Sequence, residues 1–180
     1  MENKQVILQR KQSTPFIVNY PYGENGRSIE YVWSGTIGKT INERPVPYEV
    51  FEWLKNETTT FQNGFLIIKP TDDEDIVYAK ESIENVEEVE KAIMTKAEVI
   101  AILGKGNHLT LKKALKELTE GKPESFVSNT IRYVCGIASE IGIDSSAKRK
   151  VLSEWAGIDF EKSELIFDKN IDELYEKASK

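Results

Sequence analysis

The chain has 180 residues, and 30% of them are charged, with 24 lysines and arginines against 30 aspartates and glutamates. The net charge of −6 indicates a mildly acidic, well-solvated surface, which disfavours a protein dedicated to nucleic-acid binding. The single cysteine, Cys135, excludes an intramolecular disulfide and suits a reducing compartment. The start lacks a signal-peptide core, and no segment approaches the roughly 18 apolar residues of a membrane span, so we expect a soluble protein made in the cytosol.

Short apolar runs between turn residues predict strands in the first third of the chain. The runs QVILQR and PFIVNY come first, and the pair Asn25 and Gly26 then gives a strong signal for a two-residue hairpin turn. In the run that follows, every second residue is apolar, at Ile29, Tyr31 and Trp33. This alternation predicts a half-buried strand.

A short helix and a further strand complete the expected N-terminal module. Pro47 suits a helix start, and Val50 and Leu54 follow at helical spacing. The run FQNGFLIIKP, residues 61–70, predicts another strand. Together these elements predict a small barrel or sandwich-like module over residues 1–80, with one short helix.

The second part of the chain is predicted to be helical. Residues 81–94 are acidic and lack a strong period, so we expect an acidic connector there. Thr95 and Glu98 then match a capping box, and apolar residues recur at helical spacing in segments that end at glycines. This pattern predicts a bundle of four to five helices over residues 95–180, with the short fifth helix over 170–177. The fold class is therefore α+β, with a strand-rich N-terminal module followed by a C-terminal helical bundle.

No set of residues has the spacing of a metal, cofactor or catalytic site. One histidine, His108, and one cysteine, Cys135, cannot supply a zinc site. The consecutive carboxylates of residues 72–75 lack the alternate spacing and the glycine bend of a calcium loop. We therefore expect no metal, no cofactor and no enzymatic activity, since an active site would have to be assembled from scattered residues.

The segment IASEIGIDSSAKRKVLSEW, residues 137–155, has the outline of a helix-turn-helix. Ala138 and Gly142 meet the demands of the first helix and the turn, and Val151 fits nine positions after the glycine. The sixth position after the glycine carries a lysine, where the motif needs an apolar contact. We therefore expect a packed helical hairpin with a basic face in solvent, and a nucleic-acid-binding regulator with a degenerate helix-turn-helix is the alternative. The cations of that face are Lys148, Arg149 and Lys150.

A likeness to a known family extends over about residues 19–68. It rests on a strand ending in asparagine, a Pro-x-x-Val segment that leads into a short helix, and a closing Phe-x-x-Gly-x-Leu-x-Ile strand. The residues that carry it are Pro47, Val50, Leu54, Phe61, Gly64, Leu66 and Ile68. In these features the segment resembles β-rich modules of accessory virion proteins of tailed bacteriophages. The resemblance implies a non-enzymatic structural or adaptor role on a capsid or tail.

We therefore expect a protein that acts through protein–protein contacts, as an accessory component of a phage particle made in the bacterial cytoplasm. The expected partners are a major capsid or tail protein and further copies of the chain, without a membrane, and nucleic acid is disfavoured. Large aromatic residues near turns and strand edges often anchor interfaces. The candidate contact residues on this ground are Tyr20, Tyr22, Tyr31 and Trp33. The competing interpretation is that Tyr31 and Trp33 line the core of the module.

Overall fold

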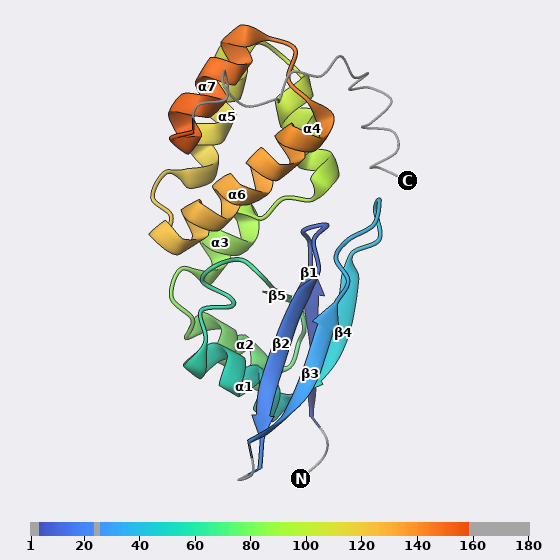
Figure 1. Ribbon diagram of the computed structural model, residues 1–180. Helices are drawn as coiled ribbons and strands as arrows, with labels where there is room; N and C mark the ends of the chain where they lie inside the picture. The colour runs from blue at the N-terminus through green and yellow to red at the C-terminus, as the bar shows by residue number, and fades with distance from the viewer. Residues whose placement is uncertain (1–3, 24–25, 159–180) are drawn as a thin grey trace. The chain divides into compact units, whose positions relative to one another are not determined.

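The computed structural model describes residues 4–23 and 26–158. The chain divides into two compact units, one up to Ile93 and one from Met94 onward. The first unit contains the strands and the second is helical (Figure 1). The predicted α+β class, with strands first and helices after, is confirmed.

The first unit consists of two small antiparallel sheets and three helices within the described residues. Its strands are β1 (Gln5–Arg10), β2 (Phe16–Tyr22), β3 (Arg27–Trp33), β4 (Asn42–Pro47) and β5 (Ile67–Ile68). Its helices are α1 (Tyr48–Glu57), α2 (Glu74–Glu81) and α3 (Val86–Ala92). One sheet has the order β4-β1-β5, and the other is the hairpin of β2 and β3.

The hairpin connection is longer than the sequence predicts. Tyr22 pairs with Arg27, so four residues, 23–26, connect the strands instead of a two-residue turn. Gly23 and Gly26 both have positive φ, 72° and 65°. Strand β2 therefore ends at Tyr22, earlier than a turn at Asn25 and Gly26 would require, while β3 begins at Arg27 as such a turn predicts. The pairing differs from the predicted one by two residues, and side chains alternate with a period of two, so each residue keeps its predicted face.

Trp33 joins the hairpin to the other sheet. Its side chain is 0% exposed, and its indole Nε1 donates a hydrogen bond to the carbonyl of Leu8 at 3.2 Å. Around it, the core gathers apolar residues from both sheets and from α1, α2 and the turn before α3. The buried indole therefore satisfies its one donor and contributes a large apolar area to the core.

Helix α1 forms where the sequence predicts it. Pro47 precedes its first residue, and Val50, Phe51 and Leu54 are buried against the strands. The predicted strand over 61–70 is reduced to the two residues of β5, because residues 59–64 form turns in which Gly64 has a φ of 68°.

Strand β4 was not predicted, because it contains two prolines. Pro45 and Pro47 pair with Ile7 and Gln5 of β1. Proline has no N–H to donate to a strand ladder, so it is tolerated only where the nitrogen points away from the paired strand, as on an edge strand. In the sheet order, β4 is an edge strand.

The stretch predicted as an acidic connector belongs to the first unit and is largely helical. Helices α2 and α3 occupy most of residues 74–92, and the first unit extends to Ile93. Asp73 caps α2 by accepting hydrogen bonds from the backbone of residues 75 and 76, and it also forms an ion pair with Lys4. Most of the acidic residues of this stretch are exposed, while Ile76, Ile83 and Val86 pack into the core.

The second unit is a bundle of helices built around its own core. They are α4 (Lys96–Gly104), α5 (His108–Thr119), α6 (Glu124–Ile141) and α7 (Ser146–Ala156). The predicted capping box of Thr95 and Glu98 is formed at the start of α4. His108 is the first residue of α5, which Asn107 caps through its side chain. The expected helix over 170–177 lies outside the described residues.

Candidate protein-contact site

The four predicted contact residues separate into two pairs. Trp33 is fully buried and Tyr31 is 8% exposed, so both line the core of the first unit. Their assignment as surface anchors is therefore wrong, and the competing interpretation holds for them. Both side chains pack at the end of the hairpin nearest the other sheet, where β3 has the buried positions of its pattern.

Tyr20 and Tyr22 lie on the same hairpin face but nearer its turn. Tyr20 is half-buried and makes an edge-on ring contact with Trp53 of α1, with centroids 5.5 Å apart. Ile29 is directly opposite Tyr20 on β3, and it is 41% exposed. Tyr22 is 58% exposed. We call this group, Tyr20, Tyr22, Ile29 and Trp53, the hairpin ledge.

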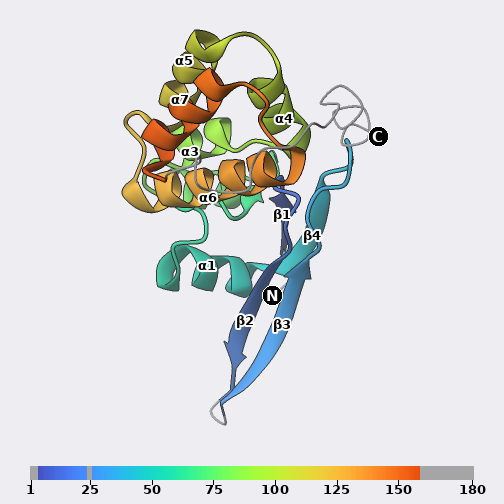
Figure 2. The same ribbon diagram turned by 45° about the horizontal axis from the view of Figure 1, so that its top comes forward.

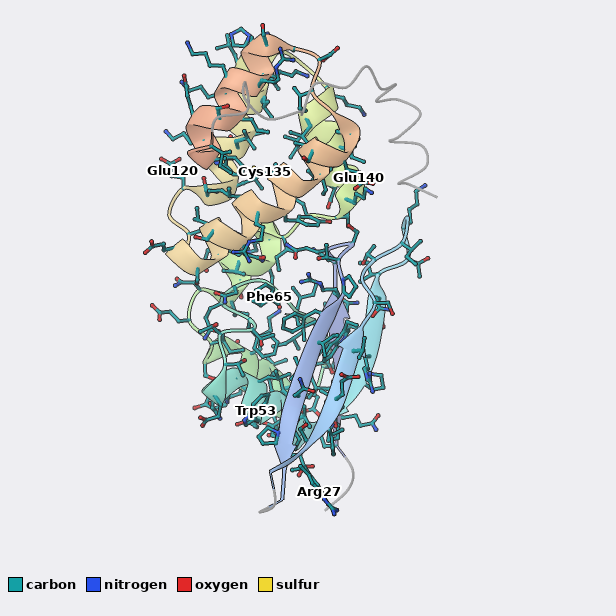
Figure 3. The ribbon with its side chains drawn as sticks, in the orientation of Figure 1. Arg27, Trp53, Phe65, Glu120, Cys135 and Glu140 are labelled. Atoms are coloured by element: carbon teal, nitrogen blue, oxygen red, sulfur yellow. The ribbon has the colours of Figure 1, made fainter. Side chains whose placement is uncertain are left out.

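The ledge exists because the inward face of the hairpin continues past the core. Directly opposed residues on antiparallel strands share a face, and the pairs from Phe16 and Trp33 outward to Tyr22 and Arg27 all do so. The pairs nearest the core are buried or half-buried, and the last pair is exposed. The hairpin reaches beyond α1 at its turn end, where Arg27 is situated (Figures 1, 2 and 3).

Charged groups border the core end of the ledge. The Arg44 guanidinium stacks on the Tyr31 ring at 5.0 Å, and it also donates to the carbonyl of Val32 at 3.1 Å. Burial raises the pKa of the Tyr31 phenol; Arg44 opposes this rise, and the Glu49 carboxylate adds to it. Glu49 is exposed in the first turn of α1, so the core end of the ledge has a carboxylate in solvent.

Ile29 and Trp53 were missed as surface residues in the sequence. Ile29 has the same alternation as Tyr31 and Trp33, so pattern alone placed it with the core. Its exposure follows from hairpin length, which the pairing register determines and the apolar pattern does not. Trp53 lies beside the buried stripe of α1, and its ring contacts Tyr20 of the hairpin.

A second feature of the first unit is a hollow beside β5. Its two adjoining parts have volumes of about 230 and 450 Å³, and both are lined by Ile68, Pro70, Lys80 and Glu87. The backbone N–H of Ile68 donates to the Glu90 carboxylate at 3.1 Å, and Lys80 forms an ion pair with the same carboxylate. These polar groups bind one another, so we interpret the hollow as the junction of α3 with the edge of the sheet.

The basic segment of α7 differs from the prediction. Lys148 is 8% exposed, not solvated, and its ammonium group donates to the carbonyls of Leu103 and Gly104, each at 2.9 Å. The register argument against a helix-turn-helix was therefore wrong: the sixth position after Gly142 is buried. Lysine can occupy it because its stem packs while its charge binds the C-terminal carbonyls of α4.

Arg149 is also held by the backbone. Its Nη1 donates to the carbonyls of Ile143 and Asp144, at 2.7 and 2.8 Å. Lys150 is exposed. Of the three cations proposed for nucleic-acid contact, one is buried and one is fixed at the turn before α7, so the basic face is smaller than predicted.

The part of the chain that the structure describes contains neither a metal-binding cluster nor a membrane-spanning helix. Within residues 4–23 and 26–158, no three His, Cys, Asp or Glu side chains are grouped so that they could hold a metal ion. Over the same ranges, no helix combines the length and the apolar character needed to cross a bilayer.

The fold and the ledge define a class: a two-unit α+β protein whose strand-rich unit presents an apolar surface on a projecting hairpin. Residues 4–85 match the family model of the YonA N-terminal domain, and residues 95–162 match that of the YonA C-terminal domain. Together the two matches cover most of the chain, which therefore belongs to the YonA family. No curated protein and no solved structure matches the chain.

Proposed function

We propose that the protein is a non-enzymatic structural or adaptor component of a bacteriophage particle that acts through protein–protein contacts. The observation that carries this proposal is the hairpin ledge. It is an apolar surface that continues a core face into solvent, with Tyr22 58% and Ile29 41% exposed. The family name is a phage-associated one, which supports the particle setting. In this setting the protein is made in the bacterial cytoplasm and joins a capsid or tail protein.

The ledge suits a protein partner because of its residue types and position. Tyrosine and tryptophan supply a large contact area at low cost in side-chain entropy, and they are enriched at interface centres. A single apolar side chain on a surface, by contrast, does not indicate a binding site. Tyr78 of α2 is 77% exposed and lies outside the ledge, so it provides a matched control.

Fractionation of phage lysates tests the proposal. Tagged wild-type chain, Tyr22→Ser and Tyr78→Ser are produced in cells that make the phage carrying the gene, and lysates are separated on density gradients. Wild type and Tyr78→Ser should sediment with particles, while Tyr22→Ser should lose most of this association and remain folded. A wild-type chain found entirely in the slow, protein-sized fractions would contradict the proposal.

A second candidate, nucleic-acid binding, is supported by the register of α6 and α7. Ala138, Ile141 and Val151 are buried as a helix-turn-helix requires. The position of Lys148, where we expected a solvent-exposed residue that the motif does not allow, is buried as well. The accessible cation is then Lys150. A duplex-DNA mobility shift that weakens with salt and is lost in Lys150→Glu would favour this candidate, and no shift at low salt would reject it.

A further inference from the structure

The outer edge of strand β2, the side turned away from β3, is unpaired. Among the described residues, its sheet contains only β2 and β3. Pro21 has no N–H and lies opposite Ser28, so its nitrogen points away from β3. Backbone groups alternate in direction along an antiparallel strand, so the N–H and carbonyl groups of Ile17 and Asn19 point outward as well. In the part of the chain that the structure describes, neither of these two N–H groups has a hydrogen-bond partner.

The carbonyl of Val32 supports this assignment of directions. Val32 lies opposite Ile17, and its carbonyl accepts a hydrogen bond from the Arg44 guanidinium at 3.1 Å. This carbonyl therefore points away from β2, as it must in a pair whose backbone groups face outward. The outer edge of β2 thus presents the N–H groups of Ile17 and Asn19 and the carbonyls of Ile17, Asn19 and Pro21, and all three residues are exposed.

The other strand edges are protected against a further strand. In the sheet β4-β1-β5, the edge strand β4 contains two prolines, whose nitrogens cannot donate. At the opposite edge, the N–H of Ile68 in β5 donates to the Glu90 carboxylate at 3.1 Å. The hairpin strand β3 contains Arg27 and Glu30, and charged side chains discourage pairing at an edge. Strand β2, FIVNYPY, has no charged residue, and its one proline removes a donor only near the turn.

Helix α1 flanks the unpaired edge. Figures 1 and 2 both show α1 on the β2 side of the hairpin, away from β3. Its Trp53 is half-buried and meets the Tyr20 ring edge-on, with centroids 5.5 Å apart, and Figure 3 shows Trp53 beside β2. The side chains of a strand point alternately to the two faces of its sheet. A strand added to β2 would therefore direct every second side chain toward α1, next to Tyr20 and Trp53.

We propose that the outer edge of β2 binds an extended segment of a partner protein, which joins the hairpin as its third strand. The inference rests on the proposed protein-contact role of the hairpin and names the form of the partner. In strand addition, main-chain hydrogen bonds supply affinity and the alternate side chains supply specificity. The segment that fits this edge has apolar residues at alternate positions, which pack on Tyr20 and Trp53, and few charges, because β2 offers none to pair with them.

A second copy of the chain is a poorer occupant than a partner's segment. Antiparallel pairing of β2 with β2 of another copy has its two-fold axis perpendicular to the joint sheet, so both α1 helices would lie on the same face. Each α1 flanks the paired edge (Figures 1 and 2). The two helices would then compete for the space over that edge, whereas a single extended segment brings no helix with it.

Two proline variants distinguish the two edges of the hairpin. Asn19→Pro removes an outward N–H from β2 and leaves the pairing with β3 in place, as Pro21 already does two residues further on. Glu30 lies directly opposite Asn19, and Glu30→Pro removes an outward N–H from β3 in the same way. Glu30→Pro is therefore the matched control. Circular dichroism and thermal unfolding show that both variants have kept the fold.

An array of synthetic peptides tests the proposal with the full chain. Overlapping peptides of about 15 residues, longer than the roughly 5–6 residues of a typical strand, represent every protein of the phage carrying the gene. Wild type and Glu30→Pro should bind the same peptides, and Asn19→Pro should bind them about tenfold or more weakly, since a bond is lost and a carbonyl is left unpaired. In the complex with a bound peptide, amide hydrogen exchange at Ile17 and Asn19 should slow.

Three outcomes would overturn strand addition: no peptide bound by wild type, equal binding by Asn19→Pro and wild type, or binding confined to peptides of the chain itself. The last outcome would identify a second copy as the occupant. The particle experiment separates this inference from the proposed function. Particle association that depends on Tyr22 but not on Asn19 rejects strand addition alone. A peptide that binds wild type but not Asn19→Pro, together with a chain absent from particles, rejects the particle role alone.

Discussion

At the C-terminal end of α4, the carbonyls of Leu103 and Gly104 accept hydrogen bonds from the ammonium group of Lys148. The last carbonyls of a helix have no partner within the helix, and they carry the negative end of its dipole. A cation that reaches them from a second helix satisfies both needs. The lysine stem meanwhile packs against the core of the bundle, so one residue joins α7 to α4 through apolar and polar contacts together.

Truncation of Lys148 should therefore destabilise the second unit. We expect Lys148→Ala to lower the free energy of unfolding by about 2–3 kcal/mol, because packing is lost and a buried carbonyl is left unpaired. Lys148→Met keeps most of the stem and should cost less, about 1–2 kcal/mol. Lys150→Ala, on an exposed neighbour, should stay within about 0.5 kcal/mol of wild type. Urea unfolding followed by circular dichroism measures all three, and equal stability of the three variants would contradict this account.

The thiol of Cys135 should be nearly inert in the folded protein. Burial raises its pKa to about 11, and only the thiolate attacks thiol reagents. The raised pKa means less thiolate at any pH below it, so at pH 8 about one thiol in a thousand is ionised. We expect an aromatic disulfide reagent to react about a hundredfold more slowly with native protein than with protein in concentrated urea. A native rate equal to the unfolded rate would show that the thiol is accessible and ionises normally.

At the scale of the element, the sequence predicted the positions of the helices better than it predicted which of their faces are buried. The capping box at Thr95 and the apolar stripe of α1 fixed two helices, because each signal is local. Phe126 lies in the buried face of α6, and the buried face of α7 includes Lys148, which the sequence placed in solvent. Periodicity alone cannot place these faces, because the neighbouring helices decide which side meets the core.

At the candidate site, too, the sequence indicated the right element but not which of its residues are exposed. Aromatic residues near a turn pointed to the hairpin, and Tyr20 and Tyr22 do lie on its ledge. Tyr31 and Trp33 lie on the same face but in the part of the hairpin that the core covers, so they are buried. Tyr22 lies beyond that part and is exposed. That length depends on a four-residue connection and on packing against residues distant in sequence, such as Trp53.

The middle of α6 contains a glycine that helix formation does not need. Gly136 has open space on its side-chain side, where an added Cβ would meet no atom within 4 Å. We expect Gly136→Ala to stabilise the protein by about 0.5–1 kcal/mol, since alanine loses less backbone entropy in a helix. Gly121 also has open space but a φ of 70°, so Gly121→Ala should cost about 1 kcal/mol. Thermal unfolding of both variants measures the contrast, and a destabilised Gly136→Ala would mean that something covers this face.

At the scale of the whole molecule, the chain builds two cores. One contains residues of the two sheets, α1, α2 and the start of α3, and the other contains residues of α4 to α7. The family matches follow the same order, with one domain for each part. The proposed contact surface lies entirely on the first unit, and this assigns the second unit no part in forming the ledge.

Because the cores are separate, a cavity in one should loosen its own unit first. Leu115 is 1% exposed in the helical core, and Phe51 is fully buried in the strand-rich core. Leu115→Ala should cost about 2–5 kcal/mol within its unit, and native-state hydrogen exchange should then speed up in α4 to α7 while β1 and β4 keep wild-type protection. Phe51→Ala should produce the reverse pattern. Equal acceleration in both units for either variant would mean that the chain opens as one cooperative body, and a contact outside both cores would then have to couple them.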